Sequence, residues 1–163
     1  MIILESLLES LRAQTAILTH QSPVEDDAWQ FMMSIFELGL LLEADPSRRP
    51  AVRGVLAETA RHLDEEIGII ERFAWNTRTR HETGWSEDPD QWRDLCTRRS
   101  ALAFFFELYE DSPLSARLPF INQAGLDEIM RDYASHGNLL PEEIPAHMPT
   151  RHWWWWLPGA PPS

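Results

Sequence analysis

The sequence predicts an all-α fold: a single-domain bundle of about five helices, followed by a proline- and tryptophan-rich extended C-terminal tail. Apolar residues recur at intervals of three and four along most of the chain, which is the helical period. Two helical segments begin with a capping residue and a proline at the first helical position. No segment shows the sustained alternation or the two-residue turn typical of strands and hairpins. The length of 163 residues suits one domain.

The first two helices are expected at about residues 2–20 and 25–44. Leucines at helical spacing mark the first. Ser22-Pro23-Val24-Glu25 is a capping box that begins the second, and acids in its first turn complement the helix dipole. The second helix is apolar on most sides, from Trp29 to Leu42. A helix of that kind lies at the centre of a bundle or at an interface.

Three further helices are expected at about residues 50–76, 88–109 and 122–135. The third has a seam in which spacings of four and three alternate, and the polar stretch from Thr77 to Asp88 is expected to be a loop. Asp88-Pro89-Asp90-Gln91 repeats the capping pattern at the start of the fourth. His136-Gly137 ends the fifth, because glycine tolerates the left-handed conformation.

We divide the chain into a helical bundle domain (1–137) and an extended tail (138–163) that packs on the bundle or on a partner. Prolines at 141, 145, 149, 158, 161 and 162 prevent a continuous helix in the tail. The tail contains four consecutive tryptophans. An extended backbone would turn Trp153 and Trp155 to one side, and Trp154 and Trp156 to the other.

Four exposed tryptophans would promote aggregation, so something must cover them. We favour burial against the chain's own bundle. A partner protein is the second interpretation, and it makes Trp153, Trp154, Trp155, Trp156 and His152 candidate partner-binding residues. A membrane interface and an aromatic cage for a quaternary ammonium ligand are weaker alternatives.

Composition narrows the function classes. Lysine is absent and the net charge is −12, which argues against nucleic acid and anionic lipid as partners and is compatible with a basic protein. The use of Arg alone indicates a GC-rich, bacterial genome. One cysteine, Cys96, fits a reducing cytoplasm and a buried, inert thiol. No apolar run is long enough to span a bilayer, and the first residues do not resemble a signal peptide.

Two side-chain clusters are candidate small sites. Glu58, His62 and Glu66 are weak candidates for metal ligands, although no second helix repeats their pattern. Arg78, Arg80 and His81 form a possible anion site. The sequence contains no glycine-rich phosphate loop and no nucleophile motif, so no cofactor is expected.

These observations favour a non-enzymatic cytosolic protein that binds another protein, as an accessory, chaperone-like or inhibitory subunit. An immunity protein is a special case, because an acidic surface suits inhibition of a basic toxin. The alternative is a helical metal-binding protein or metalloenzyme that uses Glu58, His62 and Glu66. A homodimer is possible if the tail leaves the apolar second helix uncovered.

Overall fold

The computed structural model describes residues 2–20, 25–83 and 89–163, and these form an all-α bundle with no strand among them, as predicted. Its α-helices are α1 (Ile2–His20), α2 (Glu25–Ala44), α3 (Arg49–Leu63), α4 (Ile67–Thr83), α5 (Pro89–Leu108) and α6 (Gln123–Asp132). Short 3₁₀-helices connect them and continue into the tail: η1 (Pro46–Arg48), η2 (Asp64–Glu66), η3 (Pro113–Ala116), η4 (Leu118–Phe120), η5 (Ala134–His136), η6 (Pro141–Glu143) and η7 (Trp153–Trp156).

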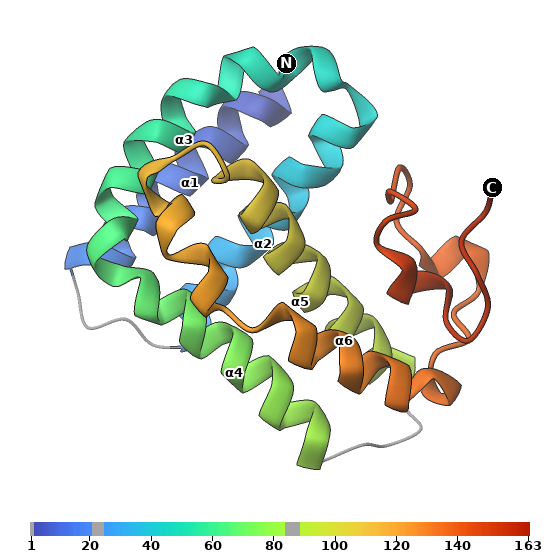
Figure 1. The fold of residues 1–163 in the computed structure, drawn as a ribbon. Coiled ribbons are helices and arrows are strands. Elements are labelled where there is room, and N and C mark those ends of the chain that lie inside the picture. Colours follow the sequence, from blue (N-terminus) through green and yellow to red (C-terminus); the bar gives the residue numbers. More distant parts are fainter. Residues whose placement is uncertain (1, 21–24, 84–88) are drawn as a thin grey trace.

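Helix α2 lies at the centre of the bundle. Its apolar composition predicted either this position or a position at an interface. Helices α1 and α5 both pack against α2, α3 packs against α1, and α4 packs against α6 (Figure 1). The tail lies on the side of the molecule away from α1 and α3, and η7 contacts α5 (Figure 1).

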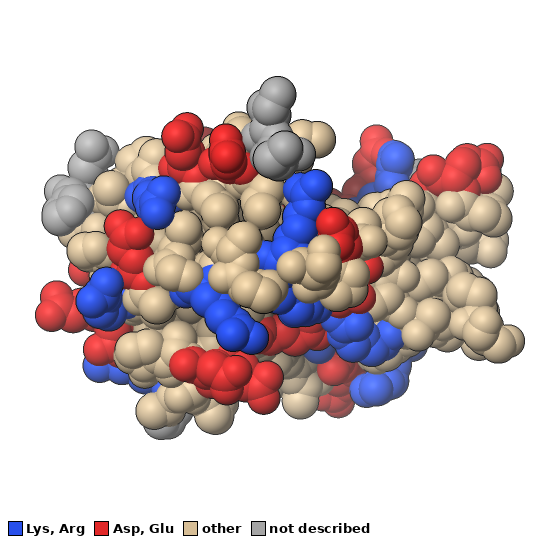
Figure 2. All heavy atoms as spheres, turned by 90° about the horizontal axis from the view of Figure 1, so that it is seen from above, with Lys and Arg blue, Asp and Glu red and all other residues tan. Residues whose placement is uncertain are grey.

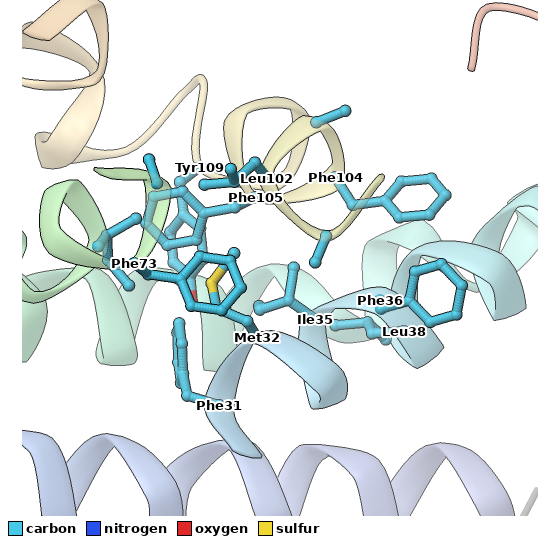
Figure 3. Close-up of a cluster of buried hydrophobic side chains, with 14 of the residues drawn as sticks. Phe31, Met32, Ile35, Phe36, Leu38, Phe73, Leu102, Phe104, Phe105 and Tyr109 are labelled. Carbon is cyan, nitrogen blue, oxygen red and sulfur yellow. The ribbon is translucent and has the colours of Figure 1, made fainter. Parts of the chain in front are cut away.

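The core sits where α2, α4 and α5 meet. Figure 3 shows aromatic and aliphatic side chains from these helices pointing toward one another, among them Phe31, Met32, Phe73 and Phe105. Helices α2 and α5 approach closely at Gly39, where an added Cβ would lie 2.2 Å from Cγ of Phe104. Glycine is required there because the aromatic ring occupies the space of a side chain.

The predicted third helix has the right buried face, but its boundaries differ from the prediction. The seam is buried throughout, at Leu56, Ala60, Leu63, Ile67, Ile70 and Ala74. The helix is interrupted at η2, where Arg117 donates a hydrogen bond of 2.6 Å to the backbone carbonyl of Asp64. A side chain that donates to a backbone carbonyl of a helix competes with the hydrogen bonds of the helix itself, and this competition explains the break.

The predicted loop after Asn76 is wrong for its first seven residues, because α4 continues to Thr83. The hydroxyl of Thr77 donates to the carbonyl of Phe73, and that of Thr79 donates to the carbonyl of Trp75. Polar threonines are therefore accommodated within the helix by bonds to the preceding turn.

The predicted start and stop signals have mixed outcomes. Ser22, Pro23 and Asp88 lie outside the described residues. Asn122 caps α6, since its side-chain oxygen accepts the backbone N–H of Gly125 at 2.9 Å.

No helix in the described ranges is both long enough and apolar enough to cross a membrane.

The predicted helix stop at His136-Gly137 is the end of the 3₁₀-helix η5, whereas α6 already ends at Asp132, and the predicted mechanism is wrong. Gly137 has φ −68°, so it is not left-handed, and Asn138 takes that conformation instead, with φ 72°. A Cβ at Gly137 would lie 2.3 Å from the carbonyl oxygen of Leu157. The glycine therefore allows the returning tail to approach the backbone, and Asn138 N–H donates to that same oxygen at 2.7 Å.

Candidate functional site

The tryptophan run forms a 3₁₀-helix, η7, between Pro149 and Pro158. A 3₁₀-helix has about three residues per turn, so its first and fourth side chains lie on the same side. Trp154 and Trp155 are buried, each 2 % exposed, while Trp153 and Trp156 are partly exposed. The predicted pairing of alternate tryptophans is wrong for this reason, whereas the preferred interpretation of burial on the chain's own bundle holds for the central two.

Ser100, on α5, binds both buried tryptophans and the histidine that precedes the run. Its Oγ accepts the indole N–H of Trp154 at 2.9 Å and that of Trp155 at 2.8 Å. It also lies 2.9 Å from Nδ1 of His152. A hydroxyl has two lone pairs and one proton, and the indoles fill the lone pairs. The O–H faces Nδ1 of His152 at 2.9 Å and Sδ of Met148 at 3.9 Å, and we infer that it donates to Nδ1, which is the nearer and stronger acceptor. We call these four side chains the serine anchor.

His152 is held in one neutral tautomer by the serine anchor. Because Nδ1 accepts a hydrogen bond, the ring proton lies on Nε2. Nε2 has no hydrogen-bond partner among the described residues and lies 3.9 Å from Oε1 of Glu107. Burial lowers the pKa of His152, and the Glu107 carboxylate acts in the opposite direction. The ring also packs on Phe104 and Trp154, with centroid distances of 4.6 and 4.8 Å.

An ion-pair cluster attaches the start of the run to the bundle from outside. Arg151 donates from Nε and Nη2 to the two carboxylate oxygens of Glu107, both at 2.9 Å, and also pairs with Glu43 of α2. Burial alone would raise the pKa of Glu107, but His152 and Arg151 lower it to about 2. The cluster is largely exposed, so its contribution to stability is small compared with that of a buried network.

Arg99 attaches the tail to α6 from inside. Its guanidinium donates to both carboxylate oxygens of Asp127, at 2.7 and 3.3 Å, and to Oε1 of Gln123 at 2.7 Å. Its Cζ lies 4.4 Å from the ring centroid of Trp154. A buried arginine is stable only when it is paired, and here the pairing joins α5, α6 and η7 in one contact.

Ser100, His152 and Glu107 are the residue types of a hydrolase triad, but their geometry suits anchoring. A nucleophilic serine needs a free lone pair and a base that can remove its proton. Both lone pairs of Ser100 are occupied by indole N–H groups, and the side chain is 0 % exposed. A substrate carbonyl has no access to this oxygen, so we assign the triad-like set a structural role.

Trp153 and Trp156 form the outer side of η7. The guanidinium of Arg131 lies over Trp153, 4.7 Å from the ring centroid. Trp156 borders a hollow of about 320 Å³ between η6 and η7. The hollow is lined by Leu139, Pro141, Ile144, Pro145, His147, Met148 and Trp156, and we call it the tail groove. Leu140 lies between the lining residues Leu139 and Pro141 in the sequence and is 56 % exposed.

Charged side chains are scarce on this part of the surface. Between residues 138 and 163 the only Asp, Glu, Lys or Arg residues are Glu142, Glu143 and Arg151. In Figure 2 the outer end of the molecule, at the right, is mostly tan, whereas red and blue residues alternate over the helical bundle. The tail therefore presents a surface with few charges and with aromatic and proline side chains.

The residues predicted to bind a metal are not brought together as those of the serine anchor are. Glu58 forms an ion pair with Arg12 of α1 at 3.1 Å, and His62 is exposed. Within the described ranges no group of three His, Cys, Asp or Glu side chains gathers where a metal could bind. Binding of a metal by Glu58, His62 and Glu66 stays a prediction.

The predicted anion site lies on a helix and not on a loop. Arg78 borders a hollow of about 260 Å³ between α4 and the start of α6, together with Trp75 and Asn122. Arg80 and His81 belong to the last turns of α4, and their side chains lie outside the described part. The anion site likewise stays a prediction.

A further hollow, about 410 Å³, lies between α3 and the C-terminal end of α5. Its charged lining residues are Arg49, Arg53, Glu107 and Asp111, so the two signs balance. It therefore has no charge preference that would indicate a ligand.

Sequence reasoning missed Ser100 and placed Cys96 correctly. The thiol is buried, burial raises its pKa, and Sγ lies 3.7 Å from the carbonyl oxygen of Trp154. Ser100 lies four residues after Cys96 and four before Phe104, so all three share one face of α5. A lone hydroxyl on an otherwise apolar face was the signal that could have identified it.

No family model, curated protein or solved structure matches this chain.

Proposed function

We propose that this chain is a non-enzymatic protein-binding protein whose contact surface is the outer side of the tail. The observation that carries the proposal is the division of the tryptophan run. Trp154 and Trp155 are fixed to the bundle by Ser100, and this fixation presents Trp153 and Trp156 at the surface. Large aromatic side chains on a rigid support are typical of binding hot spots.

The bundle holds the side chains of this surface in place, and this order favours binding as much as their composition does. Binding costs less when the contacting side chains are already ordered, because less conformational entropy is lost. The serine anchor, Arg99 and Arg151 hold η7 to three helices, so Trp156 and the tail groove are preorganised.

The charge of −12 supports a basic partner, because opposite charge raises the association rate. An accessory, chaperone-like or inhibitory subunit fits this description, and an immunity protein against a basic toxin is one such case. The location we propose for this activity is the cytoplasm of a bacterium.

Surface variants of the intact chain test the proposal. Truncation at Pro149 is unsuitable, because it removes His152, Trp154 and Trp155 from the interior. We propose affinity capture with the wild-type chain, followed by measurement of Kd for the purified partner with Trp156→Ala. The matched control is Trp75→Ala, which removes a tryptophan that is 62 % exposed on α4.

We expect Trp156→Ala to weaken binding by about tenfold or more, as loss of a hot-spot side chain does, and Trp75→Ala to leave it unchanged. Circular dichroism must show that both variants are folded. If Trp156→Ala and the double variant with Leu140→Ser bind the partner as tightly as the wild type, the outer side of the tail is not the contact surface.

A further inference from the structure

The lining of the tail groove limits the kind of partner segment that can bind in it. Its walls carry the rings of Pro141, Pro145, His147 and Trp156 and the side chains of Leu139, Ile144 and Met148. A volume of about 320 Å³ is near the lower limit for ligand pockets, so it accepts a small number of side chains. The groove therefore suits a slender segment that inserts individual side chains.

The backbone of the groove excludes pairing with a β-strand. Strand addition requires a sheet edge with free N–H and C=O groups. The described residues contain no strand, and prolines 141 and 145 have no N–H to donate. A segment that docks here is held by contacts between side chains, and polyproline II segments bind aromatic-lined grooves in that way.

The charge around the groove favours a cation on that segment. Glu142 is exposed in η6, between the lining residues Pro141 and Ile144. Glu143 is already engaged, because its Oε2 accepts the backbone N–H of Leu140 at 2.7 Å. Glu142 does not line the groove but follows its lining residue Pro141 in the sequence, so of the two acids it is the one that can meet a partner's Arg or Lys at the rim.

The chain's own tryptophans show how a cation is accommodated here. Arg99 lies over Trp154 and Arg131 lies over Trp153, with distances of 4.4 and 4.7 Å to the ring centroids. Among the described residues no arginine lies over Trp156. The Trp156 ring is therefore the one at the tail groove that can receive a cation from a partner.

We propose that the tail groove docks an extended, proline-containing segment of a partner protein that carries Arg or Lys. The partner's proline rings pack against Pro145 and Ile144, and its cation lies over the Trp156 ring and faces Glu142 at the rim of the groove. This inference rests on the proposed function, and it specifies the chemistry of the partner's docking segment.

The test is a titration of the full chain with three synthetic peptides of about ten residues, roughly 30 Å long as polyproline II. One peptide alternates Pro with Arg, one alternates Pro with Glu, and one is a helix-forming Ala and Arg peptide of equal charge. The protein variants are Trp156→Ala and Glu142→Gln. Their controls are Trp75→Ala and Glu65→Gln, which change an exposed tryptophan and an exposed acid outside the tail.

We expect the Pro/Arg peptide to bind about tenfold or more tightly than either of the others. Trp156→Ala should weaken that binding by about tenfold, and Glu142→Gln by about twofold to fivefold with less salt dependence. Glu142→Gln changes a surface side chain only, so it keeps the test valid if Trp156→Ala does not fold.

Equal binding of the Ala/Arg or the Pro/Glu peptide would overturn the inference, and so would binding that neither groove variant weakens. A dimer in sedimentation that Trp156→Ala dissociates would also overturn it, since a second copy would then fill the groove. The failure of the proposed function is a separate result. If no peptide binds but a captured partner still depends on Trp156, the docking chemistry is wrong and the surface is right.

Discussion

Replacing Ser100 with alanine removes the oxygen on which the serine anchor depends. The change deletes one atom from α5 and leaves the indole N–H groups of Trp154 and Trp155 and the Nδ1 of His152 without their partner. All three side chains are buried, so water does not readily replace the hydroxyl. The small change in volume makes this substitution a test of hydrogen bonding and not of packing.

The magnitude follows from the number of groups left unpaired. A buried donor or acceptor that loses its partner costs about 1–3 kcal/mol. Three such groups, reduced by local relaxation, give an expected loss of about 3–6 kcal/mol in the free energy of unfolding. Because a domain of this kind is stable by about 5–15 kcal/mol, the loss is a large share of the total.

The assay is urea unfolding, followed by circular dichroism and by tryptophan fluorescence, with Ser115→Ala as the control. Ser115 is exposed, so its replacement should change stability by less than about 0.5 kcal/mol. Near-ultraviolet circular dichroism reports the packing of the tryptophans in each variant. A loss below about 1 kcal/mol for Ser100→Ala, with the tryptophan signal unchanged, would refute the role of the anchor.

Two glycine substitutions test close approaches. Gly39→Ala should destabilise by about 1–3 kcal/mol, because the added Cβ overlaps the ring of Phe104, while Gly54→Ala, with open space around it, should stabilise α3 by about 0.5–1 kcal/mol. Gly137→Ala should cost about 1–3 kcal/mol and loosen the tail, since the carbonyl oxygen of Leu157 lies 2.3 Å from the new Cβ. Thermal unfolding measures all three, and an unchanged melting temperature for Gly137→Ala would contradict the contact.

The helices could be predicted from the sequence because their signals are local. The seam from Leu56 to Ala74 is a pattern of spacing within one segment, and it is buried as predicted. The interruption at η2 could not be predicted in this way. It depends on Arg117, a residue more than fifty positions away, taking the carbonyl of Asp64.

The geometry of the tail was predicted incorrectly for a related reason. Flanking prolines exclude a long helix, but they permit one 3₁₀ turn between them, and that turn places Trp153 and Trp156 together on the outer side and leaves Trp154 and Trp155 buried against the bundle. What favours the turn is the position of Ser100, where one hydroxyl can bind both indoles. The proline spacing alone contains no information about that distant partner.

Acid should destabilise the protein in two separate steps, and the first reports on the serine anchor. The folded state holds His152 with a lowered pKa, chiefly because the ring is buried, whereas the unfolded chain protonates it at the ordinary value. The unfolded state therefore binds more protons as pH falls below about 6.5, and stability decreases with falling pH from there. Protonated Nδ1 would also point a donor at Ser100, whose lone pairs are already filled.

The second step belongs to Glu107, whose pKa is about 2 in the folded state, so its stabilising contribution is lost as pH falls from about 4.5 toward 2. The variant His152→Asn separates the steps, because an amide oxygen can accept from Ser100 and does not titrate. Urea unfolding at intervals between pH 7.5 and pH 5 should show a smaller slope for His152→Asn than for the wild type. Equal slopes would mean that His152 is protonated without disturbing the anchor, and the neutral tautomer derived from the hydrogen bonds of Ser100 would be wrong.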